Sequence, residues 1–163
     1  MHSVMSSIAG RPKAFETILV GGLIAGILDG FDAVVYYGWA SGVGPTRLFQ
    51  HIASGLLGVK AFSGGWPTTF LGVACHFAIA IGAAAVFYAA SLMIPFLAQK
   101  PWISGPVFGL CVFLVMHNIV VPLSAVAPRK TPMAGWELAD QLFSHMFFVG
   151  LPIALMARRS ART

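Results

Sequence analysis

Charged side chains are scarce in this sequence of 163 residues: Asp, Glu, Lys and Arg together make up 9%. A soluble domain carries about 25%, whereas 58% of the residues here are hydrophobic. The sequence also lacks a nucleophile elbow, a phosphate-binding glycine loop after a strand, and any polar segment long enough to build a soluble active site. The composition therefore predicts a polytopic membrane protein and does not favour an enzyme.

The two cysteines and the excess of basic residues limit the expected kind of fold and the expected partners. Cys75 and Cys111 lie in apolar runs without a CxxC motif, which predicts small core residues rather than a disulfide framework. The net charge of +5 comes from basic residues near the ends of apolar segments, where anionic lipid headgroups attract them. No basic patch with interleaved aromatic residues is present, so the expected partner is the lipid bilayer and not nucleic acid.

Four apolar segments are long enough to cross a bilayer at about 1.5 Å per residue. They predict an all-α bundle of four transmembrane helices in one domain over residues 15–158, with spans at 16–39, 68–96, 103–126 and 136–157. Between the first two spans, apolar residues recur at helical spacing over 46–59, which predicts a short amphipathic helix in the membrane interface. Residues 1–14 and 159–163 are expected to form polar tails on one side of the membrane.

The distribution of basic residues predicts on which side of the membrane the two tails lie. Six lie on the side of the two tails and four on the other, a bias that places both termini in the cytoplasm. The six are Arg11, Lys13, Lys100, Arg158, Arg159 and Arg162. Arg11 and Lys13 before an apolar run would also suit a secretory signal. That run is too long for one and contains two aspartates, so we expect a retained first helix.

Glycines form a stripe along the first span, because Gly22, Gly26 and Gly30 recur every four residues. Gly105 and Gly109 repeat this spacing in the third span. Small residues at such intervals let two helix backbones approach closely. The stripes therefore predict packing faces, either inside one subunit or between subunits of a homo-oligomer or a larger membrane complex.

Each of the four spans carries one titratable side chain at a similar depth, roughly 10–14 Å from the side opposite the tails. These are Asp32, His76, His117 and His145. A charge at such a depth costs on the order of 2.5–3.5 kcal/mol, so these groups should face the protein interior. With their neighbours they predict a polar pocket of Asp29, Asp32, His76, His117, Asn118, Asp140 and His145, with His51, Glu137 and Gln141 at its mouth.

Three functions are compatible with this pocket. Its polar groups can simply join helices by hydrogen bonds that average about 0.6 kcal/mol in membranes. They can also take up an ion, a proton or a small solute. Finally, His76, His117 and His145, with Asp29 or Asp32, can ligate a transition metal or haem iron, although no HxxxH or HExxH spacing is present. We expect a transport, proton-handling or accessory protein without a cofactor; the alternative is a haem- or metal-binding redox subunit.

The order of several short motifs suggests a family. They are Gly-Leu-Ile-Ala-Gly at 22–26, His76-Phe77 with Tyr88 downstream, Pro95-Phe96, Gly105 to Gly109, His117, Pro122-Leu123, Glu137, His145 and Arg158-Arg159. This order, which covers residues 22–159, resembles the YagU-like family of small bacterial inner-membrane proteins. The resemblance implies an inner-membrane location and a recurring set of three histidines, but no particular activity.

This chain departs from the family pattern at two points. The segment between the first two spans, residues 40–66, is shorter than in the family. Asp29 and Asp32 have no clear counterpart there, so the resemblance supports no role for them.

Overall fold

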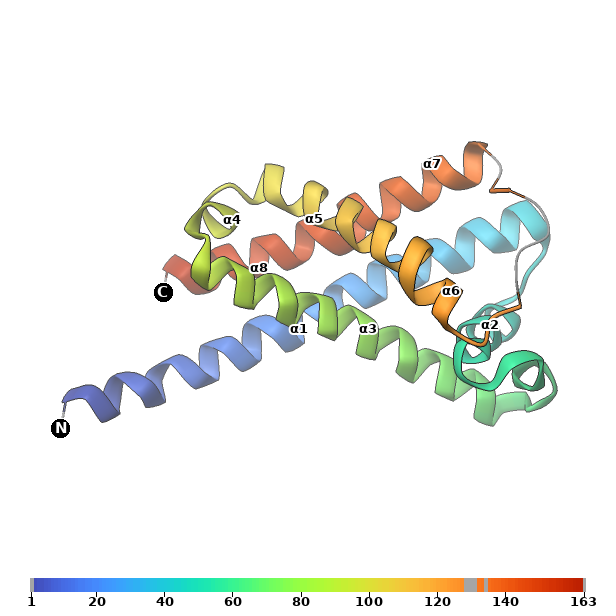
Figure 1. The fold of residues 1–163 in the computed structure, drawn as a ribbon, viewed down its shortest axis with the longest axis horizontal. Coiled ribbons are helices and arrows are strands. Elements are labelled where there is room, and N and C mark those ends of the chain that lie inside the picture. The colour runs from blue at the N-terminus through green and yellow to red at the C-terminus, as the bar shows by residue number, and fades with distance from the viewer. Residues whose placement is uncertain (1, 128–131, 134, 163) are drawn as a thin grey trace.

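A computed structural model of the chain describes residues 2–127, 132–133 and 135–162, with the backbone alone for 2–13 and 162. Throughout these residues the regular elements are all helices (Figure 1). Four of the helical stretches are long and apolar enough to cross a membrane: Ala14–Ser41, Gly65–Met93, Pro101–Leu123 and Gly135–Ala161. The predicted all-α, four-helix, multi-pass membrane fold is therefore confirmed.

The first span belongs to a longer helix, α1 (His2–Ser41). Where the sequence suggests a polar tail over residues 1–14, the backbone from His2 onward is helical. Adding a residue to an existing helix gains one hydrogen bond for each residue fixed, whereas starting a new helix is costly. The spanning helix can therefore extend into a segment that would not form a helix alone.

The short amphipathic helix α2 (Pro45–Leu57) lies at the end of the bundle away from the termini, followed by the 3-10 turn η1 (Gly58–Ser63) (Figure 1). Its buried face packs on the start of α3 (Gly65–Met93). The Gln50 side-chain amide donates to the carbonyl of Gly65 at 3.1 Å, and the Thr68 hydroxyl donates to the carbonyl of Ala61 at 2.7 Å. These bonds tie α2 and η1 to the third helix of the chain.

The second half of the chain forms two interrupted spans. The first contains α5 (Pro101–Val115), the π-helical η2 (Met116–Val120) and α6 (Val121–Leu123). The second contains α7 (Gly135–Phe143), the π-helical η3 (Ser144–Gly150) and α8 (Leu151–Arg162). The loop expected over 127–135, with Arg129 and Lys130, lies largely outside the described residues.

The second span ends at Met93, before the expected residue 96. Pro95 lacks an amide hydrogen and disfavours a helical conformation at Ile94, so α3 stops there. Pro95 then opens the short helix α4 (Pro95–Gln99), which leads into α5. This turn brings the chain back across the bundle at the end that also holds the end of α8 (Figure 1).

The glycine stripes lie at helix contacts within the chain. A Cβ atom added to Gly22 would lie 2.5 Å from the Cα atom of Ile81 in α3, and one added to Gly26 would lie 2.7 Å from the ring of Phe77. In the other half, a Cβ atom on Gly105 would lie 2.7 Å from the Cα atom of Leu151. A Cβ on Gly109 would overlap the backbone carbonyl of His145. Close backbone contact thus fixes α1 against α3, and α5 against η3 and α8.

Apolar and polar contacts divide the bundle along its length. The apolar core, nearer the termini, consists of Ala25, Ala84, Phe87, Val149, Ile153, Ala154 and Ala157. The half nearer α2 contains the acidic residues and histidines singled out by the sequence. This division leaves the polar groups of α1, α3 and η3 next to one another near the middle of the spans.

Candidate functional site

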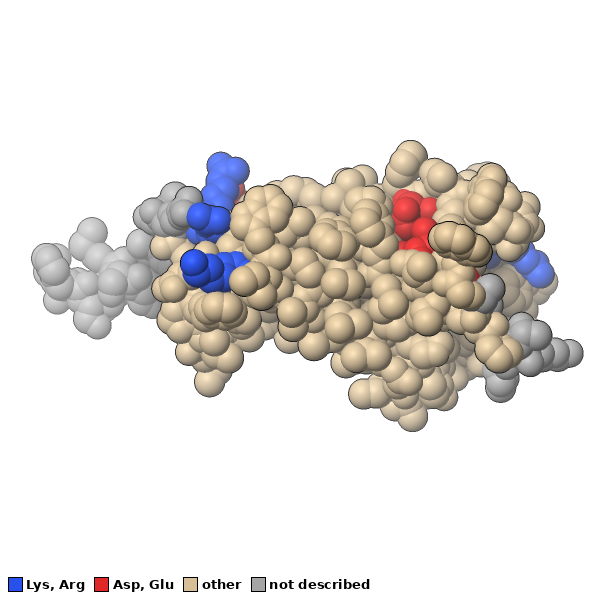
Figure 2. All heavy atoms as spheres, turned by 90° about the horizontal axis from the view of Figure 1, so that it is seen from above, with Lys and Arg blue, Asp and Glu red and all other residues tan. Residues whose placement is uncertain are grey.

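Four of the five acidic residues gather where α1 meets α7 and η3. Asp29 and Asp32 come from α1, and Glu137 and Asp140 come from α7. Asp140 is within electrostatic reach of the other three, and Asp32 is within reach of Asp29 and His145. Figure 2 shows acidic side chains as a red patch well inside the two ends, where the basic side chains lie. We call these four residues the carboxylate cluster.

Two hydrogen bonds join the carboxylate cluster across the helices. The hydroxyl of Ser144, a residue only 1% exposed, donates to Asp29 Oδ1 at 2.9 Å. The hydroxyl of Tyr37 donates to Glu137 Oε1 at 3.0 Å. Glu137, predicted at the pocket mouth, is itself buried. Both bonds run between α1 and the last span, so the cluster forms part of that helix contact.

Two oxygen atoms of the carboxylate cluster are shielded but have no hydrogen-bond partner among the described residues: Asp32 Oδ2 and Asp140 Oδ2. The described charged neighbours of Asp32 and Asp140 are other carboxylates and one histidine, with no lysine or arginine. Buried polar atoms in native proteins are nearly always bonded to protein, water or an ion. These two oxygens are therefore free acceptors in a region of concentrated negative charge.

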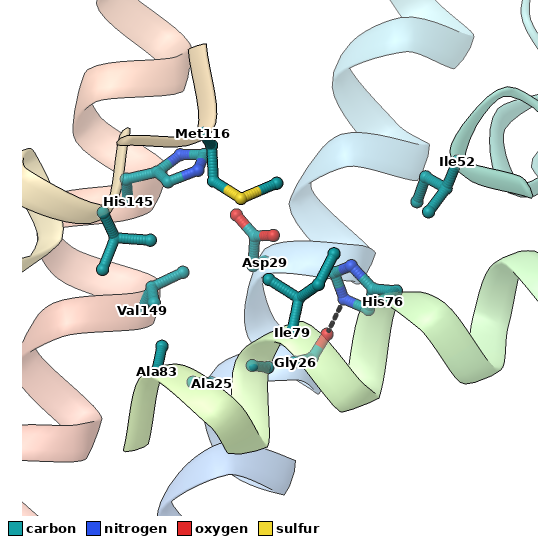
Figure 3. A pocket seen from close by; sticks show the side chains of 12 residues that line it. Ala25, Gly26, Asp29, Ile52, His76, Ile79, Ala83, Met116, His145 and Val149 are labelled. Atoms are coloured by element: carbon teal, nitrogen blue, oxygen red, sulfur yellow. Dashed lines mark hydrogen bonds between the residues drawn. The ribbon is translucent and has the colours of Figure 1, made fainter. Parts of the chain in front are cut away.

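A cavity of about 120 Å³ adjoins the carboxylate cluster. Asp29, His76 and His145 supply its polar lining, while Ile79 and Met116 are among the apolar residues that surround them (Figure 3). In Figure 3, Asp29 lies between the two histidines. A water molecule occupies about 30 Å³ in the liquid, so the cavity has room for several waters or a small polar group.

Hydrogen bonds to the backbone orient the two cavity histidines. His76 Nε2 lies 2.8 Å from the carbonyl oxygen of Gly26, and His145 Nδ1 lies 2.9 Å from that of Gln141. A carbonyl oxygen can only accept, so each of these nitrogens carries a hydrogen. The second nitrogen of each neutral ring, Nδ1 of His76 and Nε2 of His145, is then an acceptor. Gln141, predicted at the mouth, contributes its backbone carbonyl here.

The π-helical turn η3 in the last span positions Ser144 and His145. A π-helical turn holds one more residue than an α-helical turn, and such turns are frequent at functional sites. Ser144 and His145 are the first two residues of η3. The absence of a side chain at Gly109 lets α5 approach the backbone of His145 closely. This contact supports η3 where it delivers one hydroxyl and one imidazole to the site.

Of the ten residues predicted in the pocket or at its mouth, only Asp29, His76 and His145 line the cavity. Besides Gln141, three of the other seven belong neither to its lining nor to the carboxylate cluster. His117 is exposed on η2 and stacks on Phe113, with ring centroids 5.6 Å apart. Asn118 is also exposed, and its side chain donates to the carbonyl of Leu114 at 2.8 Å. His51, on α2, is exposed and stacks on Phe62. Depth along a helix says nothing about direction around its axis, so residues at the depth of Asp29 need not lie beside it.

The structure does not bring the three candidate metal ligands together. His76 and His145 share the cavity, but His117 is exposed and does not line it. Within the described part of the chain, no three His, Cys, Asp or Glu side chains are arranged to hold a metal ion. The haem- or metal-binding alternative therefore gains no support from the geometry.

Comparisons with known proteins add no assignment. A scan against protein-family models and searches of curated proteins and of solved structures gave no match. The function must therefore be inferred from the chemistry of the carboxylate cluster and the cavity beside it.

Proposed function

We propose that this multi-pass membrane protein takes up an exchangeable cation, in the simplest case a proton, at the carboxylate cluster. The observation that carries the proposal is the pair of shielded, unpartnered oxygens on Asp32 and Asp140. An unsatisfied acceptor in a low-dielectric interior is costly, and like charges nearby add to that cost. A bound proton or cation would relieve both costs at once.

The histidines beside the carboxylate cluster suit the same chemistry. Unperturbed histidine titrates near pH 6.5, and ionisable groups within membrane spans commonly form proton or ion pathways. His145 is within electrostatic reach of Asp32, and the cavity that it lines with His76 also contains Asp29. We therefore propose a transport or proton-handling role, or that of an accessory component in a larger membrane complex.

The proposal includes a location and an orientation. The resemblance to the YagU-like family favours the bacterial inner membrane. The start of α1 and the end of α8 lie at one end of the bundle (Figure 1), where basic residues are more numerous in the sequence. The positive-inside rule then favours cytoplasmic termini, with α2 and Glu137 toward the opposite surface.

Proton flux into proteoliposomes tests the proposal. A potassium gradient with valinomycin supplies the driving force, and an enclosed pH-sensitive dye reports proton entry. We expect wild-type flux above that of empty liposomes and its loss in Asp32→Asn. The matched control is Glu16→Gln, which neutralises the one acidic residue outside the carboxylate cluster. A flux equal in wild type and Asp32→Asn would refute proton conduction by this cluster.

A further inference from the structure

We infer that the cavity beside Asp29 binds the cationic headgroup of a single-chain amphiphile, which enters from the bilayer between α3 and α5. This inference rests on the proposed function, because it names the class of cation that the site would accept. Three features of the cavity support it: its boundaries, its depth in the spans and the chemistry of its lining.

The cavity adjoins an opening between the helices α3 and α5. Phe87 of α3 meets Phe108 of α5 with ring centroids 5.0 Å apart, which closes the gap toward α4. At the other end, the amide of Ala125 donates to the carbonyl of Gly55 in α2 at 2.9 Å. Between these two contacts, α3 and α5 are not among the closely packed helix pairs of the bundle. The floor of the cavity is formed by α1 and η3.

The cavity lies at the depth of the lipid chains. Asp29, Ile79 and Val112 are cavity residues from three different spans, and each lies close to the middle of its own span. The opening between α3 and α5 therefore faces hydrocarbon and not water. A ligand that uses this opening must be soluble in the bilayer, which favours a molecule with an alkyl chain.

The lining determines which headgroup fits. Asp29 contributes a carboxylate, and the free nitrogens of His76 and His145 are acceptors, so the polar lining favours a donor with positive charge. A protonated primary amine has three N–H donors and one charge. Its chain can lie against the apolar walls formed by Ile79, Val112 and Met116. The cavity of about 120 Å³ suits a compact ammonium group rather than a large ring system.

Photolabelling in lipid nanodiscs tests the inference. The probe is dodecylamine carrying a diazirine on its chain, and the neutral comparison is dodecanol with the same photoreactive chain. Peptide mass spectrometry then locates the label. We expect the amine to label the segments of α3 and α5 that line the cavity, roughly tenfold more than the alcohol does. Asp29→Asn should abolish this preference for the amine.

A matched pair of variants separates the cavity from the general lipid surface. Val112→Trp fills the cavity from α5, whereas Val107→Trp makes the same change at a lipid-exposed position of that helix. Labelling should fall in Val112→Trp and remain at the wild-type level in Val107→Trp. If Val112→Trp fails to fold, Ala83→Leu provides a smaller intrusion from α3, the opposite wall.

The possible outcomes distinguish failure of the amphiphile site from failure of the proposed function. Equal labelling by amine and alcohol, or labelling that a folded cavity-filling variant leaves unchanged, would overturn the amphiphile site. Proton flux that depends on Asp32 without amine labelling would leave the proposed function standing alone. Amine labelling that depends on Asp29 without proton flux would support the binding site and count against proton conduction.

Discussion

The substitution Gly22→Ala tests whether the glycine stripe of α1 packs against α3 of the same chain. The new Cβ would lie 2.5 Å from the Cα and 2.9 Å from the backbone nitrogen of Ile81, so the two helix backbones must separate. Overpacking of this kind costs about 1–3 kcal/mol. Alanine in place of glycine also favours a helix by about 1 kcal/mol, which offsets part of that cost.

The matched control is Gly82→Ala in α3, where a Cβ meets no heavy atom within 4 Å. It gains the helix propensity without the clash, so the difference between the two variants isolates the packing cost. We expect Gly22→Ala to be less stable than Gly82→Ala by about 1–3 kcal/mol in SDS-titrated unfolding of the purified protein. Equal stability of the two variants would refute the close α1–α3 contact.

Three further predictions concern the α1–α7 contact and the orientation. Tyr37→Phe removes the hydroxyl that donates to Glu137 and should lower the unfolding free energy by about 0.6–2 kcal/mol, since Glu137 stays buried; an unchanged value would contradict this bond. Asp140→Asn should raise that free energy at neutral pH, because it removes a charge surrounded by other carboxylates; destabilisation would show that the charge is needed for folding. In a chain without Cys75 and Cys111, an impermeant maleimide added to intact cells should label Gly44→Cys and not Gln99→Cys, and the opposite pattern would reverse the orientation.

The helices could be predicted from the sequence because their causes are local. Apolar runs of sufficient length identify the four spans, and the four-residue spacing of Gly22, Gly26 and Gly30 indicates a packing face. Pro95 ends α3 a few residues earlier than the apolar run suggests. The amphipathic pattern over 46–59 matches α2 and the first turn of η1.

The site could be predicted only in part, because it depends on directions around helix axes. Counting residues along each span predicts similar depths for His76, His117 and His145, but it does not give the direction of each side chain around its helix axis. His117 and His145 also lie in the π-helical turns η2 and η3, where the regular α-helical spacing does not hold. In the structure His117 is exposed and does not line the cavity, whereas His145 does. Helical spacing alone cannot reveal a π-helical turn.

Tyr37 shows a second limit of the sequence. An aromatic residue near the end of a span is typical of the membrane surface, and the sequence alone favours that interpretation of Tyr37. Its hydrogen bond to Glu137 requires that α1 lie beside α7, a neighbour relation between segments 100 residues apart. Ser144 and Asp29 are related in the same way. Such pairs become evident only once the order of the helices in the bundle is known.

The most direct test of the central claim is an infrared titration of the purified protein in lipid. Protonated carboxyl groups give a C=O stretching band separate from that of carboxylates. We expect a band that appears reversibly on acidification in wild type and Glu16→Gln and is diminished in Asp32→Asn, because the proposed function assigns the exchangeable proton to the carboxylate cluster. A titration identical in all three proteins would contradict the account, since the cluster would then hold no exchangeable proton at Asp32.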